Sequence, residues 1–117
     1  MLAISSSTKA YLCLINVDFR KGIDGLQAFC RNIIEEDPFS GTIFIFKNRS
    51  GTSIRTLAYD GQGFWMCTKR LSKGKFHWWP DKNDGTGVII RACDLQALLW
   101  NGNPKQAKFS EDWKKIN

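Results

Sequence analysis

The sequence predicts an α+β fold: a single domain with an antiparallel β-meander of about four to six strands and two main helices packed on one face. Three observations support this class. Short runs of β-branched and aromatic residues alternate with tight turns in the middle of the chain. One segment before these runs and one after them have apolar residues at helical spacing. The length of 117 residues allows one core but not a second independent one.

The first predicted elements are a strand and a helix. Residues 11–17 are short and apolar, which indicates a strand. After a polar loop at 18–25, apolar residues recur at helical spacing from Ile23 to Ile34, and Asp24 is expected to cap the helix. The helix is closed at Asp37, because the residue before a proline is pushed out of the helical region.

Four strands and a second helix are expected next. The strands are predicted at 42–47, 53–59, 64–71 and 75–79, and the turns between them at 48–51, 60–63 and 72–74. After an exposed loop at 81–87 and a short apolar stretch at 88–90, Asp94 is expected to cap a helix that ends near Gly102. We assign the domain to residues 1–104 and expect a polar, loosely ordered tail at 105–117.

The net charge is concentrated in the middle of the chain. Residues 38–80 contain seven basic residues and one acid, so they carry the whole formal net charge of +6. A cationic stretch of one sign attracts anionic polymers, and its Lys and Arg side chains would contact phosphates. The residues predicted to contact nucleic acid are Lys47, Arg49, Arg55, Lys69, Arg70, Lys73, Lys75, His77 and Trp78.

The same stretch contains nine aromatic residues, which allow two interpretations. Small domains need large side chains to build a core, and this favours the core for most of them. Phe76, Trp78 and Trp79 are the residues that could instead face a ligand and stack on unpaired bases.

Groups suited to enzyme chemistry are few and isolated. His77 is the one histidine, and no cysteine lies within nine residues of it, so it lacks the close ligand pairs of a zinc site. Asp18, Asp60 and Asp94 each have a local explanation at a turn or a helix start, which argues against an acidic triad for two-metal chemistry. We predict a protein that is not an enzyme, with no catalytic residue, no metal site and no cofactor.

The cysteines and the hydropathy pattern indicate the compartment. The cysteines have no C-x-x-C spacing and mostly sit among apolar neighbours, so they are expected to be small buried hydrophobes in a reducing compartment: Cys13, Cys30, Cys67 and Cys93. No apolar run approaches the roughly 20 residues that span a bilayer. The first residues lack the pattern of a signal peptide. We expect a cytoplasmic protein without membrane contact.

Five segments resemble the signatures of a known family, in order and spacing. They are VDFRKGIDGL at 17–26 (V-D-M-R-K-G-x-D-G-L), DPFSG at 37–41 (D-P-x-S-G), FIFKNR at 44–49 (F-V-F-x-N-R), DGQGFW at 60–65 (D-G-x-G-x-W) and KRLSKGKFHW at 69–78 (K-R-L-x-x-G-x-F-x-W). The family is the small TnpB-type accessory protein encoded by the second open reading frame of insertion sequences of the sixty-six family.

The resemblance implies a bacterial mobile element whose transposase is a separate, larger protein. DNA, and the transposase or other proteins of the same element, are therefore the expected partners. The chain departs from the family pattern at three positions. Ser50 stands where a second basic residue usually follows Asn-Arg, which weakens the turn as a phosphate clamp. Arg55 replaces a typical lysine, and Trp100 stands where members tend to have an acid.

Two functions remain open. The leading hypothesis is a non-enzymatic accessory protein of transposition that binds DNA through the basic meander. The alternative is an adaptor that docks on the transposase without DNA contact, through the loop formed by Asp18, Phe19, Arg20 and Lys21. The same loop also fits a purely structural turn, in which Asp18 accepts backbone hydrogen bonds and pairs with Arg20.

Overall fold

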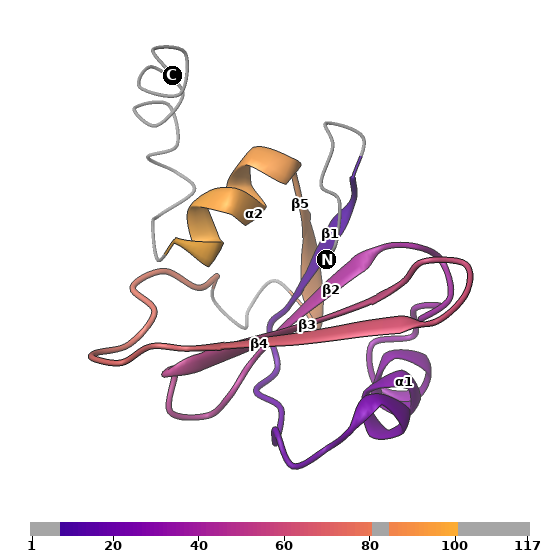
Figure 1. Ribbon diagram of the computed structural model, residues 1–117, viewed down its shortest axis with the longest axis horizontal. Helices are drawn as coiled ribbons and strands as arrows, with labels where there is room; N and C mark the ends of the chain where they lie inside the picture. Colours follow the sequence, from indigo (N-terminus) through magenta and orange to yellow (C-terminus); the bar gives the residue numbers. More distant parts are fainter. Residues whose placement is uncertain (1–7, 81–84, 101–117) are drawn as a thin grey trace.

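The computed structural model describes residues 8–80 and 85–100, which form a five-stranded sheet and two helices (Figure 1). The predicted α+β class is confirmed. The elements are β1 (Ala10–Cys13), α1 (Ile23–Asn32), β2 (Ile43–Lys47), β3 (Ser53–Tyr59), β4 (Phe64–Arg70), β5 (Gly87–Ile90) and α2 (Ala92–Leu99). The predicted tail at 105–117 lies outside the described residues.

The sheet is mixed, with strand order β4-β3-β2-β1-β5. The hairpins β2–β3 and β3–β4 are antiparallel, so the predicted meander holds for these three strands. β1 pairs parallel to β2, because α1 connects them as a crossover, and β5 pairs antiparallel to β1. The central strands β1 and β2 are consequently buried on both faces.

The two helices cover opposite faces of the sheet, which corrects the prediction that they share one face. Successive side chains of a strand point to opposite faces. Tyr11 and Cys13 of β1 pack in one cluster with Leu26 of α1, whereas Leu12 packs in a second cluster with Leu95 of α2. Helical periodicity reveals that a helix has an apolar side but not which face of a sheet receives it, so this error could not be avoided from the sequence.

The predicted fourth meander strand at 75–79 is wrong. After β4 the chain turns back over the 48–52 turn, where the Phe76 N–H donates to the Gly51 carbonyl at 2.9 Å. Phe76 is buried, and the half-buried Trp78 and Trp79 pack against the cluster under α2. Trp79 Nε1 also donates to the Cys13 carbonyl at 3.0 Å. The aromatic run therefore contributes to the core, because this buries more apolar surface than an edge strand would.

Helix starts also differ from the prediction in detail. Gly22, without a side-chain cap, precedes α1, and Asp24 lies in the first turn instead of capping it. Arg91 is the N-cap of α2, and the Asp94 carboxylate accepts a hydrogen bond from the Arg91 N–H at 3.4 Å. Asp94 thus satisfies a free backbone donor from inside the helix, as the third residue of a capping box.

The cysteine prediction is confirmed only in part. Cys13 and Cys30 are buried, and burial raises the pKa of their thiols to about 11 and about 12. Cys93 is half-buried, whereas Cys67 is exposed on β4. Cys67 is exposed because it points to the α2 face of the sheet, and no residue of β4 belongs to the buried cluster under α2.

Candidate nucleic-acid interface

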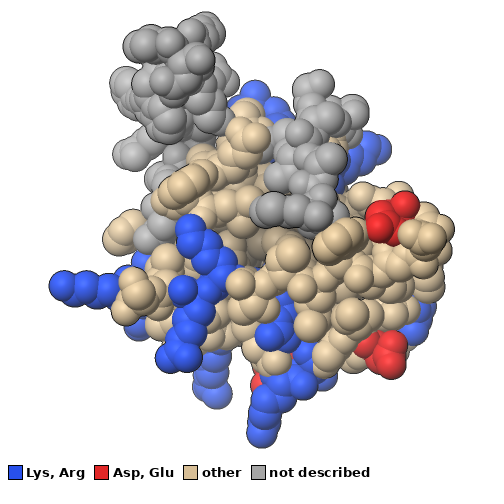
Figure 2. Space-filling view, viewed as in Figure 1, with Lys and Arg blue, Asp and Glu red and all other residues tan. Residues whose placement is uncertain are grey.

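Most of the predicted cationic residues gather at one end of the sheet, where β2 ends, β3 begins and β4 ends. We call this region the cationic end. Figure 2 shows Lys and Arg side chains mainly over the left and lower parts of the view, with others at its top and right margin, and Asp and Glu mainly at the right. The cations of the cationic end come from the 18–21 loop, the 48–51 turn, the ends of β2 and β4 and the segment after β4: Arg20, Lys21, Lys47, Arg49, Arg70, Lys73 and Lys75.

The turn between β2 and β3 is held rigid by Asn48. Its side-chain oxygen accepts the Ser53 N–H at 3.1 Å, and its amide nitrogen donates to the Thr52 hydroxyl at 3.3 Å. Gly51 closes the turn with φ of 75°, a conformation that favours glycine. Arg49 is exposed on this turn. A cation on a fixed turn loses little backbone freedom when it contacts a phosphate.

The 18–21 loop is a turn in which charge is locally paired. The Asp18 carboxylate accepts the Arg20 N–H at 2.9 Å and the Arg20 guanidinium at 2.6 Å. The hydrogen bonds from the Arg20 side chain make the largest contribution to lowering the pKa of Asp18, and the bond from its backbone N–H makes the second. Together they bring this pKa to about 2. The hydrogen bonds expected of a structural turn are therefore present, and docking of a partner at this loop stays a prediction. The Arg20 side chain is nevertheless 91% exposed, so it faces solvent while it pairs.

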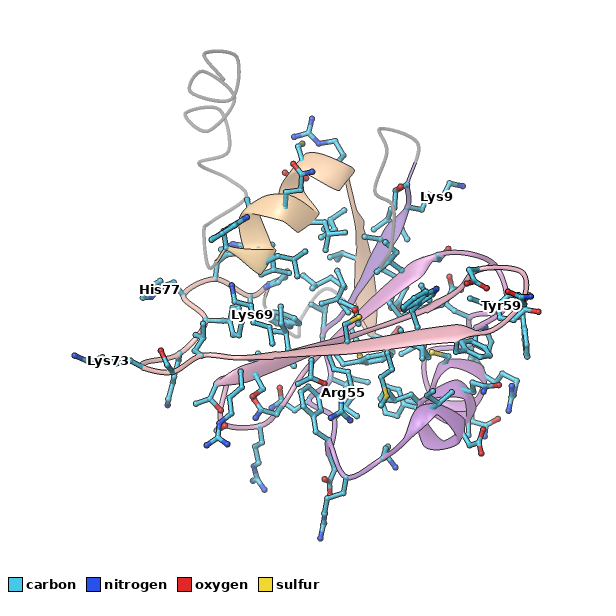
Figure 3. The ribbon with its side chains drawn as sticks, in the orientation of Figure 1. Lys9, Arg55, Tyr59, Lys69, Lys73 and His77 are labelled. Carbon is cyan, nitrogen blue, oxygen red and sulfur yellow. The ribbon has the colours of Figure 1, made fainter. Side chains whose placement is uncertain are left out.

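Arg55 fastens this loop to the sheet. Its Nη1 donates to the carbonyls of Phe19 at 2.8 Å and Lys21 at 3.0 Å, and its Nε donates to the Thr68 hydroxyl at 2.7 Å. The guanidinium also lies 4.6 Å from the centroid of the Phe19 ring. Figure 3 shows Arg55 below the sheet, on the side of α1. The Nε and Nη1 groups of Arg55 are thus engaged within the chain, and its predicted phosphate contact stays a prediction.

A shallow depression connects the predicted partner-binding loop with the predicted DNA-binding turn, which are separate in the sequence. It has a volume of about 730 Å³ and is lined by residues of the 16–20 loop and the 48–50 turn, including Phe19, Arg20 and Arg49. The Val17 N–H donates to the Lys47 carbonyl at 3.0 Å and holds the two segments together. The loop predicted to bind a partner and the turn predicted to bind DNA therefore form one surface.

The predicted cations surround the end of the sheet and do not lie on one face. Lys69 and Arg70 are neighbours on β4 and point to opposite faces. The Lys69 ammonium donates to the Leu99 carbonyl at the end of α2 and lies 5.3 Å from the Trp100 ring centroid. Lys47 lies 5.4 Å from the Trp79 ring centroid, on the same side. In Figure 3, Lys73 and His77 project outward beyond the end of β4.

The opposite end of the sheet carries a surface that the sequence analysis missed. Phe39, Tyr59 and Phe64 form a cluster with ring centroids 4.9, 5.1 and 5.0 Å apart, and Phe39 is 50% exposed. Beside it, the Asp60 carboxylate accepts the backbone N–H groups of residues 62 and 63 and Trp65 Nε1, each at 2.8 Å. The two backbone hydrogen bonds contribute most to lowering the pKa of Asp60, and the hydrogen bond from Trp65 contributes less. We call this region the acidic aromatic end.

A usable signal for this surface was present in the sequence. The segments DPFSG and DGQGFW each pair an acid with an aromatic residue. The proximity of the two segments depends on the tertiary fold, which brings the ring centroids of Phe39 and Phe64 to 5.1 Å. Among residues 8–80 and 85–100, no cluster of three or more His, Cys, Asp or Glu side chains is placed to hold a metal ion. Within these residues, no helix is long and apolar enough to cross a membrane.

The fold and these surfaces define a small α+β protein with a group of cations at one end of its sheet and an aromatic cluster beside Asp60 at the other. Residues 8–108 match the family model described as IS66 Orf2 like protein. The chain therefore belongs to the IS66 Orf2-like family, whose members are accessory proteins of insertion-sequence transposition.

Two relatives from Sinorhizobium fredii support the assignment. The protein named uncharacterized protein y4jC is 34% identical over 102 residues, which cover 87% of this chain and 85% of the relative. The protein named uncharacterized protein y4hO is 29% identical over 99 residues, which cover 85% and 84% of the two chains. No solved structure shows a significant match to the chain.

Proposed function

We propose that this protein is a non-enzymatic accessory of transposition that binds DNA through its cationic end. The observation that carries the proposal is the gathering of cations from four segments at one end of the sheet, while the Asp60 turn and Asp37 lie at the other. Charge of one sign on one side of a small protein attracts a polyanion and orients it during approach.

The arrangement favours contacts with phosphates over reading of base sequence. The cations surround an end that consists of turns and loops, and no described helix presents them to a major groove. Arg49 and Lys73 are exposed on two separate turns, so each can contact a different phosphate. Trp78 is half-buried against the core, so phosphate contacts from the turns carry this proposal more than base stacking does.

The test is the salt dependence of DNA binding. The purified protein is titrated onto fluorescently labelled duplex and single-stranded DNA, and the anisotropy is measured at several salt concentrations. We expect log K to fall by about 0.9 for each phosphate contacted per log unit of salt on duplex DNA. Absence of binding to either DNA at low salt contradicts the proposal.

A second candidate function is the adaptor that docks on the transposase. The depression between the 16–20 loop and the 48–50 turn supports it, because Val17 and Phe19 add apolar lining to the charged rim. Replacement of Arg20 and Lys21 by Ala is expected to abolish co-purification with the transposase of the same element and to leave the circular dichroism spectrum unchanged. Retained co-purification counts against docking at this loop.

A further inference from the structure

β4 is an edge strand with an open outer side. The strand order places it at one margin of the sheet, and no described strand pairs with its outer side. It is the most exposed of the five strands, whereas four of the five residues of β2 are buried. Figure 1 shows β4 along the near side of the sheet. Natural proteins rarely leave a seven-residue edge uncovered, because its free N–H and C=O groups can pair with another chain.

The hydrogen-bond pattern fixes which residues of β4 point outward. The bonds from Asp60 to Gly63 and from Leu71 to Thr52 identify the hydrogen-bonded pairs at the two ends of the β3–β4 ladder. Because such pairs alternate along an antiparallel ladder, residues 65, 67 and 69 bond to β3. The outward N–H and C=O groups therefore belong to Phe64, Met66, Thr68 and Arg70.

The side chains of β4 are ordered so that two antiparallel copies of the strand are complementary to each other. Phe64 and Trp65 occupy its first half, Lys69 and Arg70 its second half, and Cys67 its centre. When two copies pair antiparallel about Cys67, Phe64 lies opposite Arg70 of the second copy and Trp65 opposite its Lys69. Cross-strand pairs of aromatic and cationic side chains are favourable, whereas like charges directly opposite are unfavourable.

Neighbouring registers lack this complementarity. Moving the two-fold axis by one residue in either direction removes both kinds of aromatic–cation pair. Moving it to Lys69 places that cation opposite its own copy. Only the register centred on Cys67 pairs all seven residues of β4 and brings the outward hydrogen-bonding groups of the two strands together.

Charges beyond the strand ends agree with the same register. Antiparallel pairing brings the 60–63 turn of each copy beside the segment that follows β4 in the other. The first carries Asp60, and the second carries Lys73, whereas Lys75 lies against the 48–51 turn of its own chain. The acidic aromatic end of one copy is thereby placed next to the cationic end of the other, which is the charge complementarity that a self-association surface needs.

We propose that two copies of this chain associate through their β4 edges, antiparallel about Cys67, to form one continuous sheet across the dimer. Such a two-fold contact uses the same surface on both copies and closes without further growth. The proposal rests on the exposed β4 edge and not on DNA binding, although Arg70 and Lys73 belong to both surfaces.

Cys67 provides the most direct test. In this register the two Cys67 residues form a non-hydrogen-bonded pair, with Cα atoms about 4.5 Å apart, which is within the range of a disulfide. Mild oxidation of the purified full chain at low concentration should give a covalent dimer on a non-reducing gel. The Cys67→Ser variant should give none, and the Cys93→Ser variant should behave as the wild type. A covalent dimer that persists without Cys67, or none in the wild type, overturns the proposal.

A charge exchange tests the register without any disulfide. Trp65→Lys places an ammonium group opposite Lys69 of the second copy, and we expect the dissociation constant from analytical ultracentrifugation to rise roughly tenfold, because two symmetry-related pairs are lost. Adding Lys69→Glu to this variant should restore the dimer, and Lys69→Glu alone serves as the control, because it also removes the hydrogen bond from Lys69 to the Leu99 carbonyl. Circular dichroism checks the fold of each variant. A reduced wild-type protein that is monomeric at every concentration, or a dimer unaffected by Trp65→Lys, contradicts the proposal.

Discussion

The two ends of the sheet are built from the same β3–β4 hairpin but differ in chemistry. At the acidic aromatic end, Asp60 organises a tight turn and the rings of Tyr59 and Phe64 pack with Phe39. At the cationic end, Arg55 and Asn48 organise the loops, and Arg49 and Lys73 face solvent. One end uses its side chains mainly on itself, whereas the other presents charge outward. Substitutions at the acidic aromatic end should therefore mainly lower stability, whereas substitutions of exposed cations at the cationic end should mainly weaken the binding of a polyanion.

The largest effect on stability is expected at the acidic aromatic end. Phe64→Ala removes a half-buried ring that contacts Phe39, Tyr59 and the core under α1, and should lower the free energy of unfolding by about 2–3 kcal/mol. Urea unfolding measures the change. DNA affinity of the folded variant should equal that of the wild type. A large loss of affinity would show that the two ends are not separate in function.

A somewhat smaller loss of stability is expected from Arg55→Ala, which releases the loop at the cationic end. The carbonyls of Phe19 and Lys21 lose their donor, so we expect the unfolding free energy to fall by about 1–2 kcal/mol. Unlike Phe64→Ala, this variant should also bind DNA more weakly, because the loop that carries Arg20 is no longer held. Arg55→Lys should not restore stability, since an ammonium cannot reproduce the forked geometry of three hydrogen bonds. An unchanged unfolding free energy of Arg55→Ala in urea would contradict the inference that Arg55 holds the 18–21 loop on the sheet.

The smallest effect is a pH dependence at the two acidic turns. The pKa of Asp18 is lowered to about 2 and that of Asp60 is also lowered. A carboxyl whose pKa is lower in the folded state stabilises the protein above its unfolded value of about 3.9. This contribution disappears as the pH falls through the folded value. The urea concentration at the unfolding midpoint should therefore drop as the pH falls from about 5 to about 2. Asp60→Asn should reduce this drop. An equal drop in Asp60→Asn and the wild type would refute the assignment.

Local patterns were sufficient to predict most elements but not their packing. The strand at 53–59 and the helix start at Ile23 follow directly from residue spacing, and both are confirmed. The aromatic run at 76–79 satisfies the same criteria as a strand, yet its rings fill the core because of contacts with Cys13 and α2 that are remote in sequence. The opposite orientation of Lys69 and Arg70 follows from the alternation of a strand and was predictable. The contact between Arg55 and Phe19, 36 residues apart, was not.

The central claim is that the cationic end binds DNA, and one comparison of two double variants tests it most directly. Arg49→Ala/Lys73→Ala removes one Arg and one Lys from the cationic end, and Arg31→Ala/Lys9→Ala removes the same residue types from exposed positions elsewhere. Both variants lose the same charge, so a general loss of attraction affects them alike. Anisotropy titrations on one duplex over a range of salt should show a salt slope smaller by about two for the first variant and an almost unchanged slope for the second. Equal slopes for the two variants would contradict the account.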